Sequence, residues 1–469
     1  MSQKKETTVL LLSLFVTLGL VGGGLSLFKE QIFTQNLSGN NLQTIGNSSI
    51  ADRISFGEKA LISGQVNPSK IEGVQAFAAQ NYAKAIAKLE TSLKQQRNDP
   101  EALIYLNNAR IGSAKSYSIM ASVPLGTDPD ASLEILRGVA QAQNAVNTSG
   151  GITSGIIKGV PLKVGIANDD DNPEISKQIA GSLVQNPAVL GVVGPNASDT
   201  TLAAGTDYNT GKLVAISPTS TSVKITNFSP YIFRTVPSDF MAARSLANYM
   251  VKNLQKKQAV VFFNSQSNYS ESLKNEFVSS VVLEGGQVLR EFDLSQVNFS
   301  AAKSLEQAAG QGAEVLMLAT NNETQDKALQ IVQINQKRLN LLGGDDVYTV
   351  KTLEVGGEQA SGMVVAVPWH ISGDLQSKFP EKSRQLWGGD VSWRTAMAYD
   401  ATVALIAALE KNPTRSGVQQ ALSSPDFSAI GAAGAIRFLP SGDRTSPVQL
   451  VKIVPGKRAG TDYDFEPLP

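Results

Sequence analysis

The chain has 469 residues, of which 42% are hydrophobic and 17% charged, and its 41 basic side chains balance its 41 acidic ones. This length exceeds one ordinary domain, so we expect two or three compact units of globular composition. The charge balance and the lack of a long basic run argue against a nucleic-acid-binding protein.

The chain has no cysteine and one histidine, His370. The missing cysteines exclude thiol nucleophiles, disulfides, thiolate metal sites and an N-terminal lipidated cysteine, and one histidine cannot build a multi-histidine zinc site. No G-x-S-x-G elbow accompanies His370, so a structural role is its default interpretation, and no phosphate-binding G-x-x-x-x-G-K-[ST] loop is present. We therefore expect neither an enzyme nor a bound cofactor or metal.

Residues 9–28 form an uncharged apolar segment. About 20 helical residues cross the hydrocarbon core of a bilayer, and Lys4 and Lys5 favour a cytoplasmic N-terminus of residues 1–8. A cleaved signal peptide is the competing interpretation, because Gly22–Gly24 supplies small residues, and a buried core helix is a third. The favoured prediction is a single-pass anchor in the inner membrane, with the bulk of the chain on the periplasmic side.

Two segments follow the predicted anchor. Residues 29–69 are rich in Asn, Ser, Gln and Gly and predict a linker. Residues 70–112 place apolar side chains such as Tyr82 and Ile86 at helical spacing, and Asn98–Pro100 separates two helices. This segment resembles one and a half tetratricopeptide repeats. Because a repeat array needs about three units, a helical hairpin packed on its neighbour is an equally good interpretation, and no ligand is assigned.

Residues 115–457 alternate short apolar runs with longer amphipathic stretches. Such runs, bounded by Gly, Pro, Asn and Asp, suit parallel strands buried on both faces, and the segments between them have βαβ length. The region is too long for one doubly wound sheet, so we predict an α/β fold of two doubly wound parallel-sheet lobes joined by a hinge. Residues 458–469 are expected to be a C-terminal tail. The apolar runs are 162–167, 189–193, 212–217, 259–263, 314–319 and 363–367.

Loops after two of these runs carry hydroxyl groups. Ser198 follows the run 189–193, and Thr219 and Thr221 follow the run 212–217. Ligands of doubly wound sheets bind beyond the carboxyl ends of the strands, and hydroxyls with free backbone N–H groups at a helix start suit a carboxylate. Either loop alone is an ordinary helix cap, whereas the two together indicate a shared anion site.

The second half of the region adds an aromatic and an acidic candidate. Tyr269 follows the run 259–263, and the pair Asp345–Asp346 follows the sequence LNLLGG. Tyr269 is a candidate lid, with simple packing as its alternative. The acidic pair lies at a strand end where a carboxylate can receive an ammonium group, and a solvated acidic turn is the alternative.

Several longer blocks resemble the type I periplasmic binding proteins, above all the leucine/isoleucine/valine-binding proteins of ABC transporters. These blocks run in the family's order from about Ser116 to Lys457, most of the chain. SWRTAMAYDA and VPWH also resemble a membrane-anchored subgroup found in cyanobacteria. The blocks include EILRGVAQAQNAVNTSGGI, VPLKVGIANDD, LGVVGPNASDTT, LVAISPTSTS, YIFRTVPSD, NYSES, LLGGDD and SWRTAMAYDATVAL.

The resemblance implies a role for each candidate in the first lobe. Ser198 stands where the family binds the α-carboxylate of an amino acid. Thr221 matches the threonine that contacts both the carboxylate and the amine, and Thr219 matches the neighbouring position that contributes backbone atoms.

In the second lobe, the resemblance implies that Tyr269 closes over the ligand and that Asp345 pairs with the α-ammonium group. Asp346 is the alternative if the register differs by one residue. Where the family often has a second tyrosine, this chain has Thr320 and Asn321. The specificity for the ligand's side chain is therefore left undecided between an aliphatic and a polar ligand.

The predicted function is a receptor that delivers an amino acid or a similar small polar zwitterion to the permease subunits of an ABC transporter. A zwitterion buried between two lobes needs both of its charges compensated, which the hydroxyl loops and the acidic pair provide. The alternative is a non-transport interaction protein, either similar to the activators of penicillin-binding proteins or a ligand sensor that acts through a partner.

Overall fold

The computed structural model describes residues 49–468 apart from 63, 65–66, 155–156 and 375. The described residues form one compact unit. The predicted anchor, residues 9–28, lies outside the described residues. Within residues 49–468, no helix combines the length and the apolar character that a membrane crossing requires.

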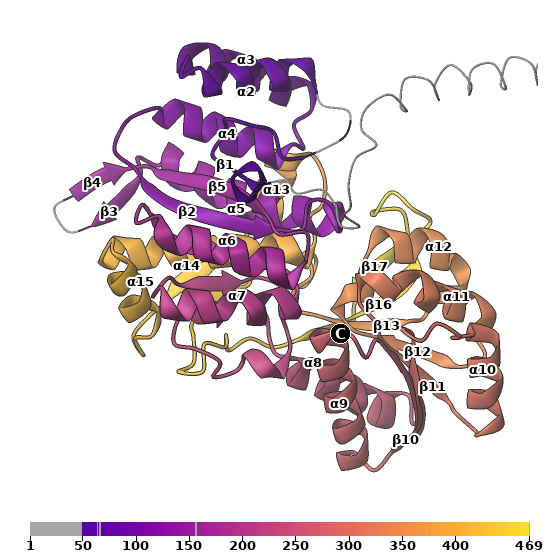
Figure 1. Ribbon diagram of the computed structural model, residues 1–469. Coiled ribbons are helices and arrows are strands. Elements are labelled where there is room, and N and C mark those ends of the chain that lie inside the picture. Colours follow the sequence, from indigo (N-terminus) through magenta and orange to yellow (C-terminus); the bar gives the residue numbers. More distant parts are fainter. Residues whose placement is uncertain (1–48, 63, 65–66, 155–156, 375, 469) are drawn as a thin grey trace, which may run out of the picture. The chain divides into compact units, whose positions relative to one another are not determined.

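The first lobe is built on a six-stranded sheet of order β1-β5-β2-β6-β7-β8 (Figure 1). All neighbouring strands are parallel except β1, which pairs antiparallel with β5. The strands are β1 (Ile54–Ser55), β2 (Tyr117–Val123), β5 (Leu162–Asn168), β6 (Val189–Val193), β7 (Ala215–Ser217) and β8 (Ile232–Arg234). Two small hairpins, β3 (Ile152–Ser154) with β4 (Ile157–Val160) and β14 (Ala429–Gly431) with β15 (Gly434–Ile436), lie outside this sheet.

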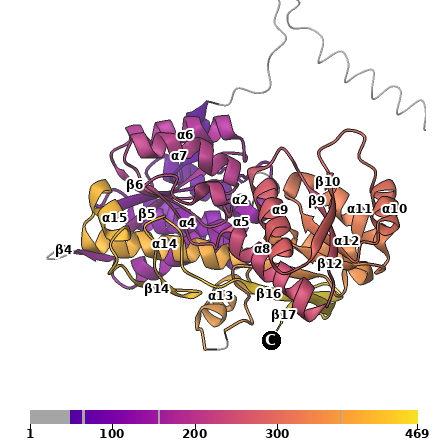
Figure 2. The same ribbon diagram turned by 90° about the horizontal axis from the view of Figure 1, so that it is seen from below.

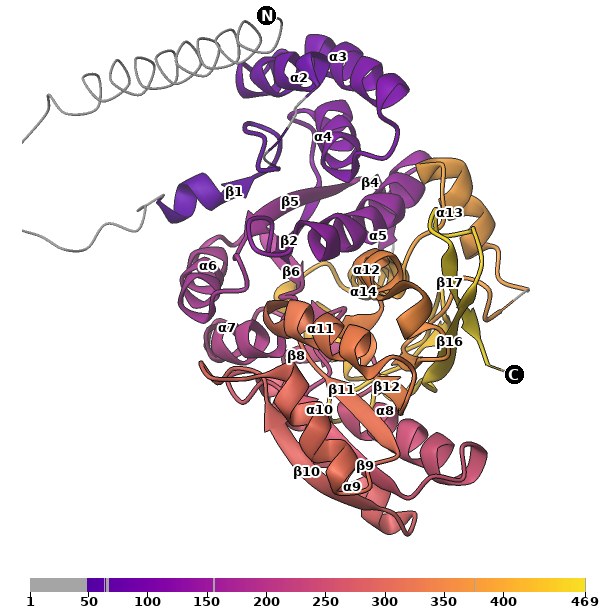
Figure 3. The same ribbon diagram turned by 90° about the vertical axis from the view of Figure 1, so that its right-hand side faces the viewer.

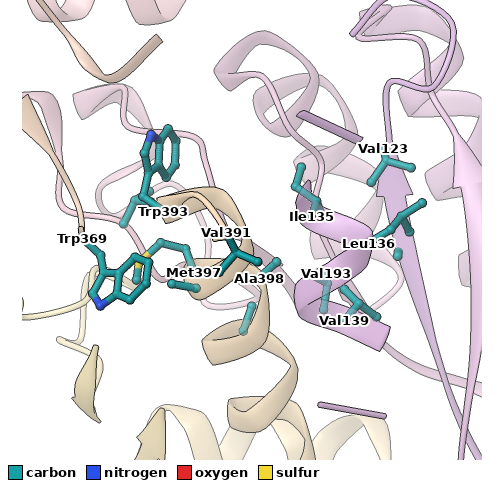
Figure 4. Close-up of a cluster of buried hydrophobic side chains, with 14 of the residues drawn as sticks. Val123, Ile135, Leu136, Val139, Val193, Trp369, Val391, Trp393, Met397 and Ala398 are labelled. Atoms are coloured by element: carbon teal, nitrogen blue, oxygen red, sulfur yellow. The ribbon is translucent and has the colours of Figure 1, made fainter. Parts of the chain in front are cut away.

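Two long helices of the first lobe, α5 (Pro129–Thr148) and α14 (Trp393–Lys411), pack along each other (Figure 2). Their approach requires Gly138, because a Cβ there would collide with the backbone of Thr395. Figure 4 shows Ile135, Leu136 and Val139 of α5 in the same apolar cluster as Trp393, Met397 and Ala398 of α14. The lobe also contains α6 (Pro173–Gln185), α7 (Ser198–Thr210), α13 (Phe379–Trp387) and α15 (Arg415–Leu422).

The second lobe has a seven-stranded sheet of order β10-β9-β11-β12-β13-β16-β17. Strands β9 to β13 are parallel, and β16 and β17 are added antiparallel. The strands are β9 (Gln258–Phe263), β10 (Gln287–Asp293), β11 (Val315–Ala319), β12 (Asn340–Gly343), β13 (Val364–Val367), β16 (Gln449–Pro455) and β17 (Tyr463–Pro467).

Alternate residues of β9 point to opposite faces of this sheet, as the two-residue period of a strand requires. Ala259 and Val261 pack under α8 (Asp239–Asn248) and α9 (Asn268–Leu283). Val260 and Phe262 belong to the core of the other face, with α10 (Ala301–Gly310), α11 (Gln325–Asn335) and α12 (Val350–Ala360). Burial on both faces is the reason for the unbroken apolar run at 259–263. The short helical turns are Ile50–Arg53, Val223–Ile225, Tyr249–Asn253, Asn322–Thr324 and Asp345–Val347.

The structure differs from the predicted linker and tail. Within the predicted linker 29–69, Ile54–Ser55 pairs with β5 as an edge strand. Within the predicted tail 458–469, Tyr463–Pro467 pairs with β16. Both strands are too short and too mixed in composition to produce a periodic signal, so only their backbone pairing identifies them.

The predicted helical segment 70–112 forms α2 (Pro68–Ala78), α3 (Tyr82–Gln95) and α4 (Pro100–Ile111), and α3 packs on both of the others, with α2 and α3 outermost (Figure 3). The third helix is buried along most of its length against α5 and β5. The side-chain amide of Asn108 donates to the carbonyl of Val164 at 2.7 Å. This packing favours the hairpin interpretation over a free-standing repeat.

A buried ion cluster fixes these helices. The Lys70 ammonium lies 2.8 Å from a carboxylate oxygen of Asp99 and 2.7 Å from one of Glu101. Glu101 also accepts a hydrogen bond from the hydroxyl of Tyr105. Because all three charged side chains are out of water, each depends on its partners for compensation.

We expect Lys70→Met to lower the free energy of unfolding by about 3–5 kcal/mol, because it leaves two buried carboxylates without a cation. Urea denaturation followed by circular dichroism measures the loss. Lys88→Met, which breaks an exposed pair with Glu72, is the matched control and should cost less than about 1 kcal/mol. Equal effects of the two substitutions would contradict this account of the cluster.

Candidate functional site

The chain crosses between the lobes three times within its described part: between β8 and α8, between β13 and α13, and between Arg444 and β16. These crossings are the candidate hinge. They bring the carboxyl ends of the parallel strands of both lobes towards a common boundary, where loops of doubly wound sheets bind ligands.

Two of the predicted residues, one from each lobe, line the same small cavity at this boundary. Thr221 follows β7 in the first lobe, and Asp345 follows β12 in the second. The cavity has a volume of about 10 Å³ and also exposes Asp239, the first residue of α8. The structure therefore places Thr221 and Asp345 at the same cavity.

Tyr269 lies in the first turn of α9 and joins the same group. Its hydroxyl donates to a carboxylate oxygen of Asp345 at 2.7 Å, and both side chains are buried. The structure thus places Tyr269 against the acidic residue. The Tyr269 hydroxyl also accepts a long hydrogen bond from the backbone N–H of Asp346, at 3.4 Å.

Ser198, the first residue of α7, and Thr219, in the loop after β7, do not line the cavity. The Ser198 hydroxyl oxygen accepts from the backbone N–H of Ser222 at 3.2 Å. The Thr219 hydroxyl donates to the carbonyl of Asn196 at 2.7 Å. Both side chains therefore brace the two loops against each other in this arrangement.

Asp239 is a member of the site that the sequence patterns did not single out. Its side chain is 1% exposed. No hydrogen bond of good geometry reaches one of its carboxylate oxygens or the Thr221 hydroxyl, although the nearby hydroxyls of Ser272 and Thr221 act to lower the pKa of Asp239. Burial raises the pKa of Asp239 to about 7 from an ordinary value of 3.8. Burial also raises the pKa of Asp345. The available signal was position, since Asp239 follows β8 within the block YIFRTVPSD.

Polar contacts hold the two lobes against each other around this cavity. Asp199, in the first turn of α7, accepts a hydrogen bond from the backbone N–H of Asn268 in α9 at 3.1 Å. Arg394, at the start of α14, pairs with Asp346 of the second lobe at 2.8 Å. Asp345 lines the small cavity, whereas Asp346, paired with Arg394, lines a larger one.

Arg394 is itself held from the first lobe. Its guanidinium lies 4.3 Å from the ring centroid of Trp393, which is fully buried in the cluster shown in Figure 4. The ion pair between Arg394 and Asp346 links the two lobes. It therefore stabilises the relative orientation of the lobes in which the two side chains meet, and not other orientations.

A second, larger cavity of about 680 Å³ lies at the same boundary. It is lined by residues 127–131 of the first lobe, by 346 and 348–351 of the second, and by Arg394. Ligand-binding pockets typically measure about 300–1,000 Å³, so its size suits a small organic molecule. None of the five predicted site residues lines it.

His370 does not line either cavity. Its Nδ1 accepts from the backbone N–H of Ser372 at 3.2 Å, and its ring packs edge-on against Tyr348. Burial lowers the pKa of His370 to about 4. A buried, neutral imidazole of this kind agrees with the structural role expected from the sequence.

Comparison with known proteins gives consistent matches. A family model described as "Periplasmic binding protein" matches residues 126–460. A Leu/Ile/Val-binding protein homolog 3 from Brucella melitensis is 22% identical over 337 residues, 67% of this chain and 84% of that protein. An amino acid binding protein from Pseudomonas aeruginosa is 28% identical over 138 residues, 29% of this chain, and the chain spans only 35% of that relative.

A solved structure of similar fold is an ABC transporter substrate-binding protein from Desulfitobacterium hafniense in complex with Leu. It has a TM-score of 0.64 and 23% identity, and the match covers 76% of this chain and all of that one. This likeness confirms the predicted architecture of two parallel-sheet lobes.

The buried acid should make the stability of the protein depend on pH. Because the folded-state pKa of Asp239 lies above its unfolded value, the folded state binds more protons between about pH 4 and pH 7, and stability falls as pH rises through that window. Asp239→Asn removes this pH-dependent contribution to the free energy of unfolding. Its stability relative to the natural chain should grow by about 2–3 kcal/mol from pH 5 to pH 8.

Urea unfolding of both proteins at several pH values measures this difference. Arg234 and Asp346 act electrostatically on Asp239, and Asp239 in turn raises the pKa of Asp345, so Asp239→Asn also lowers the pKa of Asp345. A difference that stays constant from pH 5 to pH 8 would show that Asp239 is not a buried acid of raised pKa.

Proposed function

Because this chain belongs to the family of periplasmic binding proteins, we propose that it is an extracytoplasmic solute-binding receptor of an ABC transporter. It captures a small amino-bearing solute, an amino acid or a similar polar zwitterion, between its lobes. The observation that carries the proposal is the cavity where Thr221 of the first lobe meets Asp239 and Asp345 of the second.

The cavity suits the amino end of such a solute. An ammonium group donates three hydrogen bonds, and Thr221, Asp239 and Asp345 present oxygen acceptors from both lobes. Hydrogen bonds to charged groups contribute about 1.5–3 kcal/mol each. A cation at this position also favours the ionised forms of Asp239 and Asp345, whose pKa values are raised by burial.

Binding at this position couples to the orientation of the lobes. A ligand that contacts Thr221 and Asp345 together has its full set of partners only when the lobes are closed. It therefore shifts the population towards the closed form by its differential affinity for that form. In this proposal Tyr269, bonded to Asp345, orients the carboxylate towards the ligand, and the closed face is recognised by the permease subunits.

The carboxylate end of a zwitterion would lie at the loops of the first lobe. Ser198 begins α7, and the first backbone N–H groups of a helix, with its dipole, attract anions. Thr219 and Thr221 lie in the neighbouring loop. This assignment rests on the family resemblance of these positions.

The cellular placement is part of the same proposal. The uncharged segment 9–28, preceded by Lys4 and Lys5, would tether the receptor to the inner membrane with the lobes on the periplasmic side. A tethered receptor stays near its membrane permease, which raises the effective concentration of one for the other.

A thermal-shift screen of the purified full chain against the twenty amino acids and simple amines tests the proposal. At least one compound should raise the melting temperature, because a ligand that binds only the folded state stabilises it by mass action. Asp345→Asn keeps the shape and an acceptor for Tyr269 but removes the charge, and should abolish the shift.

Asp426→Asn is the matched control, because Asp426 is exposed and lines neither cavity. This variant should respond as the natural chain does. If no amino acid or amine shifts the melting temperature of a well-folded sample, the receptor proposal is refuted.

A further inference from the structure

We infer that an ionic latch between the lobes, sensitive to salt concentration, stabilises their closed arrangement. The latch consists of two ion pairs, Arg394 with Asp346 and Arg458 with Asp390. The inference goes beyond the proposed function, because it concerns the movement of the lobes and is tested without a ligand.

Both ion pairs join one lobe to the other. Arg394, in the first turn of α14 of the first lobe, lies 2.8 Å from Asp346, which follows β12 in the second. Arg458 lies between β16 and β17 of the second lobe, 3.2 Å from Asp390, which lies between α13 and α14 of the first. Every other ion pair between described residues lies within the second lobe, or within the first lobe with its N-terminal helices. Separation of the lobes would therefore break these two pairs and leave the others intact.

The side chains of Arg458 and Asp390 are each fixed on their own lobe. Arg458 also pairs with Glu466 of β17 at 3.0 Å and donates to the carbonyl of Phe465 at 2.7 Å. Asp390 also pairs with Arg384 of α13 at 2.5 Å. Because the two side chains have less freedom left to lose, their pairing across the boundary costs less conformational entropy than that of two free side chains.

The segment that carries Asp390 is also held by the N-terminal helices. The guanidinium of Arg97, in the turn between α3 and α4, donates to the carbonyls of Gln385 and Leu386 at the end of α13. Gly388 then turns the chain with a φ of 86°, and a Cβ there would lie 3.1 Å from the Cδ of Arg97. The helices that follow the proposed tether in the chain therefore help to position the latch.

Both ion pairs are accessible to dissolved salt. All four side chains line the larger cavity. Those of Arg458 and Asp390 are 30% and 25% exposed, and those of Arg394 and Asp346 are 9% and 30% exposed. The screening length falls from about 30 Å at 0.01 M salt to about 3 Å at 1 M. High salt should therefore weaken the latch, and the pair of Arg458 with Asp390 more than the other.

The hydrogen bonds between the lobes should respond less to salt. Asp199 accepts from the backbone N–H of Asn268 at 3.1 Å. The backbone N–H of Val223 donates to the Ser272 hydroxyl at 3.0 Å. Each of these contacts involves at most one charge, whereas screening acts mainly between two charges. The two ion pairs therefore carry most of the salt dependence of closure.

In the proposed receptor, the latch would influence how tightly the solute is held. The apparent affinity of a ligand for the closed form scales with the fraction of molecules that are closed. A receptor whose latch is screened at high ionic strength would therefore hold its solute less tightly.

Distances between the lobes at several salt concentrations test the inference. Because the natural chain has no cysteine, Thr127→Cys and Val350→Cys allow one spin label in each lobe. Both residues are uncharged and exposed and line the larger cavity from opposite lobes. Double electron–electron resonance of the full chain in non-ionic detergent, without ligand, measures the ratio of the short-distance to the long-distance population. The measurement is made at pH 8, where Asp346 is ionised although burial raises its pKa to about 7.

We expect this ratio to fall about threefold or more between 0.01 M and 1 M NaCl, because screening weakens the two ion pairs that favour the closed form. A distance distribution that stays the same over this range would overturn the inference. The receptor proposal would be unaffected by that result, since no ligand is present.

Substitutions connect the salt response to the latch. The combination of Asp390→Asn and Asp346→Asn removes both ion pairs with little change in shape, and the labelled variant should show a low ratio that no longer depends on salt. Glu291→Gln is the matched control, because it breaks an ion pair with Lys274 within the second lobe, and it should respond as the labelled parent does. A double variant that keeps the full salt response would exclude these ion pairs as its cause.

Discussion

The compensation of buried charge is the constraint on which the rest of this molecule depends. Asp400 and Arg444, both fully buried, pair at 2.6 Å within the first lobe, and Lys70 serves two buried acids among the N-terminal helices. Asp239 is buried without such an ion pair, and one of its oxygens has no hydrogen-bond partner of good geometry. It lies at the boundary between the lobes, where a ligand can supply a hydrogen-bond donor.

The position of Asp239 links binding to movement. It begins α8, the first element after the chain leaves the first lobe, and its backbone N–H donates to the carbonyl of Thr221 at 2.8 Å. A change in the protonation or the hydrogen bonds of Asp239 therefore affects the chain crossing between β8 and α8, which is one of the three segments of the candidate hinge. Asp345 and Tyr269 approach the same point from the second lobe, so that a ligand in the cavity contacts both moving parts.

The N-terminal helices extend the first lobe. Because α4 packs on α5 and β5, and Ile54–Ser55 pairs with β5, the segment that follows residue 49 is part of the lobe's edge. In this arrangement α2 and α3 lie outermost, stacked on α4. The membrane tether proposed for residues 9–28 would then lead into a segment that is itself packed on the first lobe.

The sequence by itself determined the α/β class and the two lobes, because apolar runs such as 259–263 record burial on both faces of a strand. It also located the loops that carry Thr221 and Asp345, which follow the run 212–217 and the sequence LNLLGG. Only the tertiary structure decided that Asp239 belongs to the site and that Ser198 and Thr219 brace loops. The pattern of a strand can be read from neighbouring residues in the sequence. Whether a buried side chain finds a hydrogen-bond partner depends on all the groups that folding brings close to it. The three-residue strand before Asp239 and the two-residue edge strand at Ile54 are too short to carry a period.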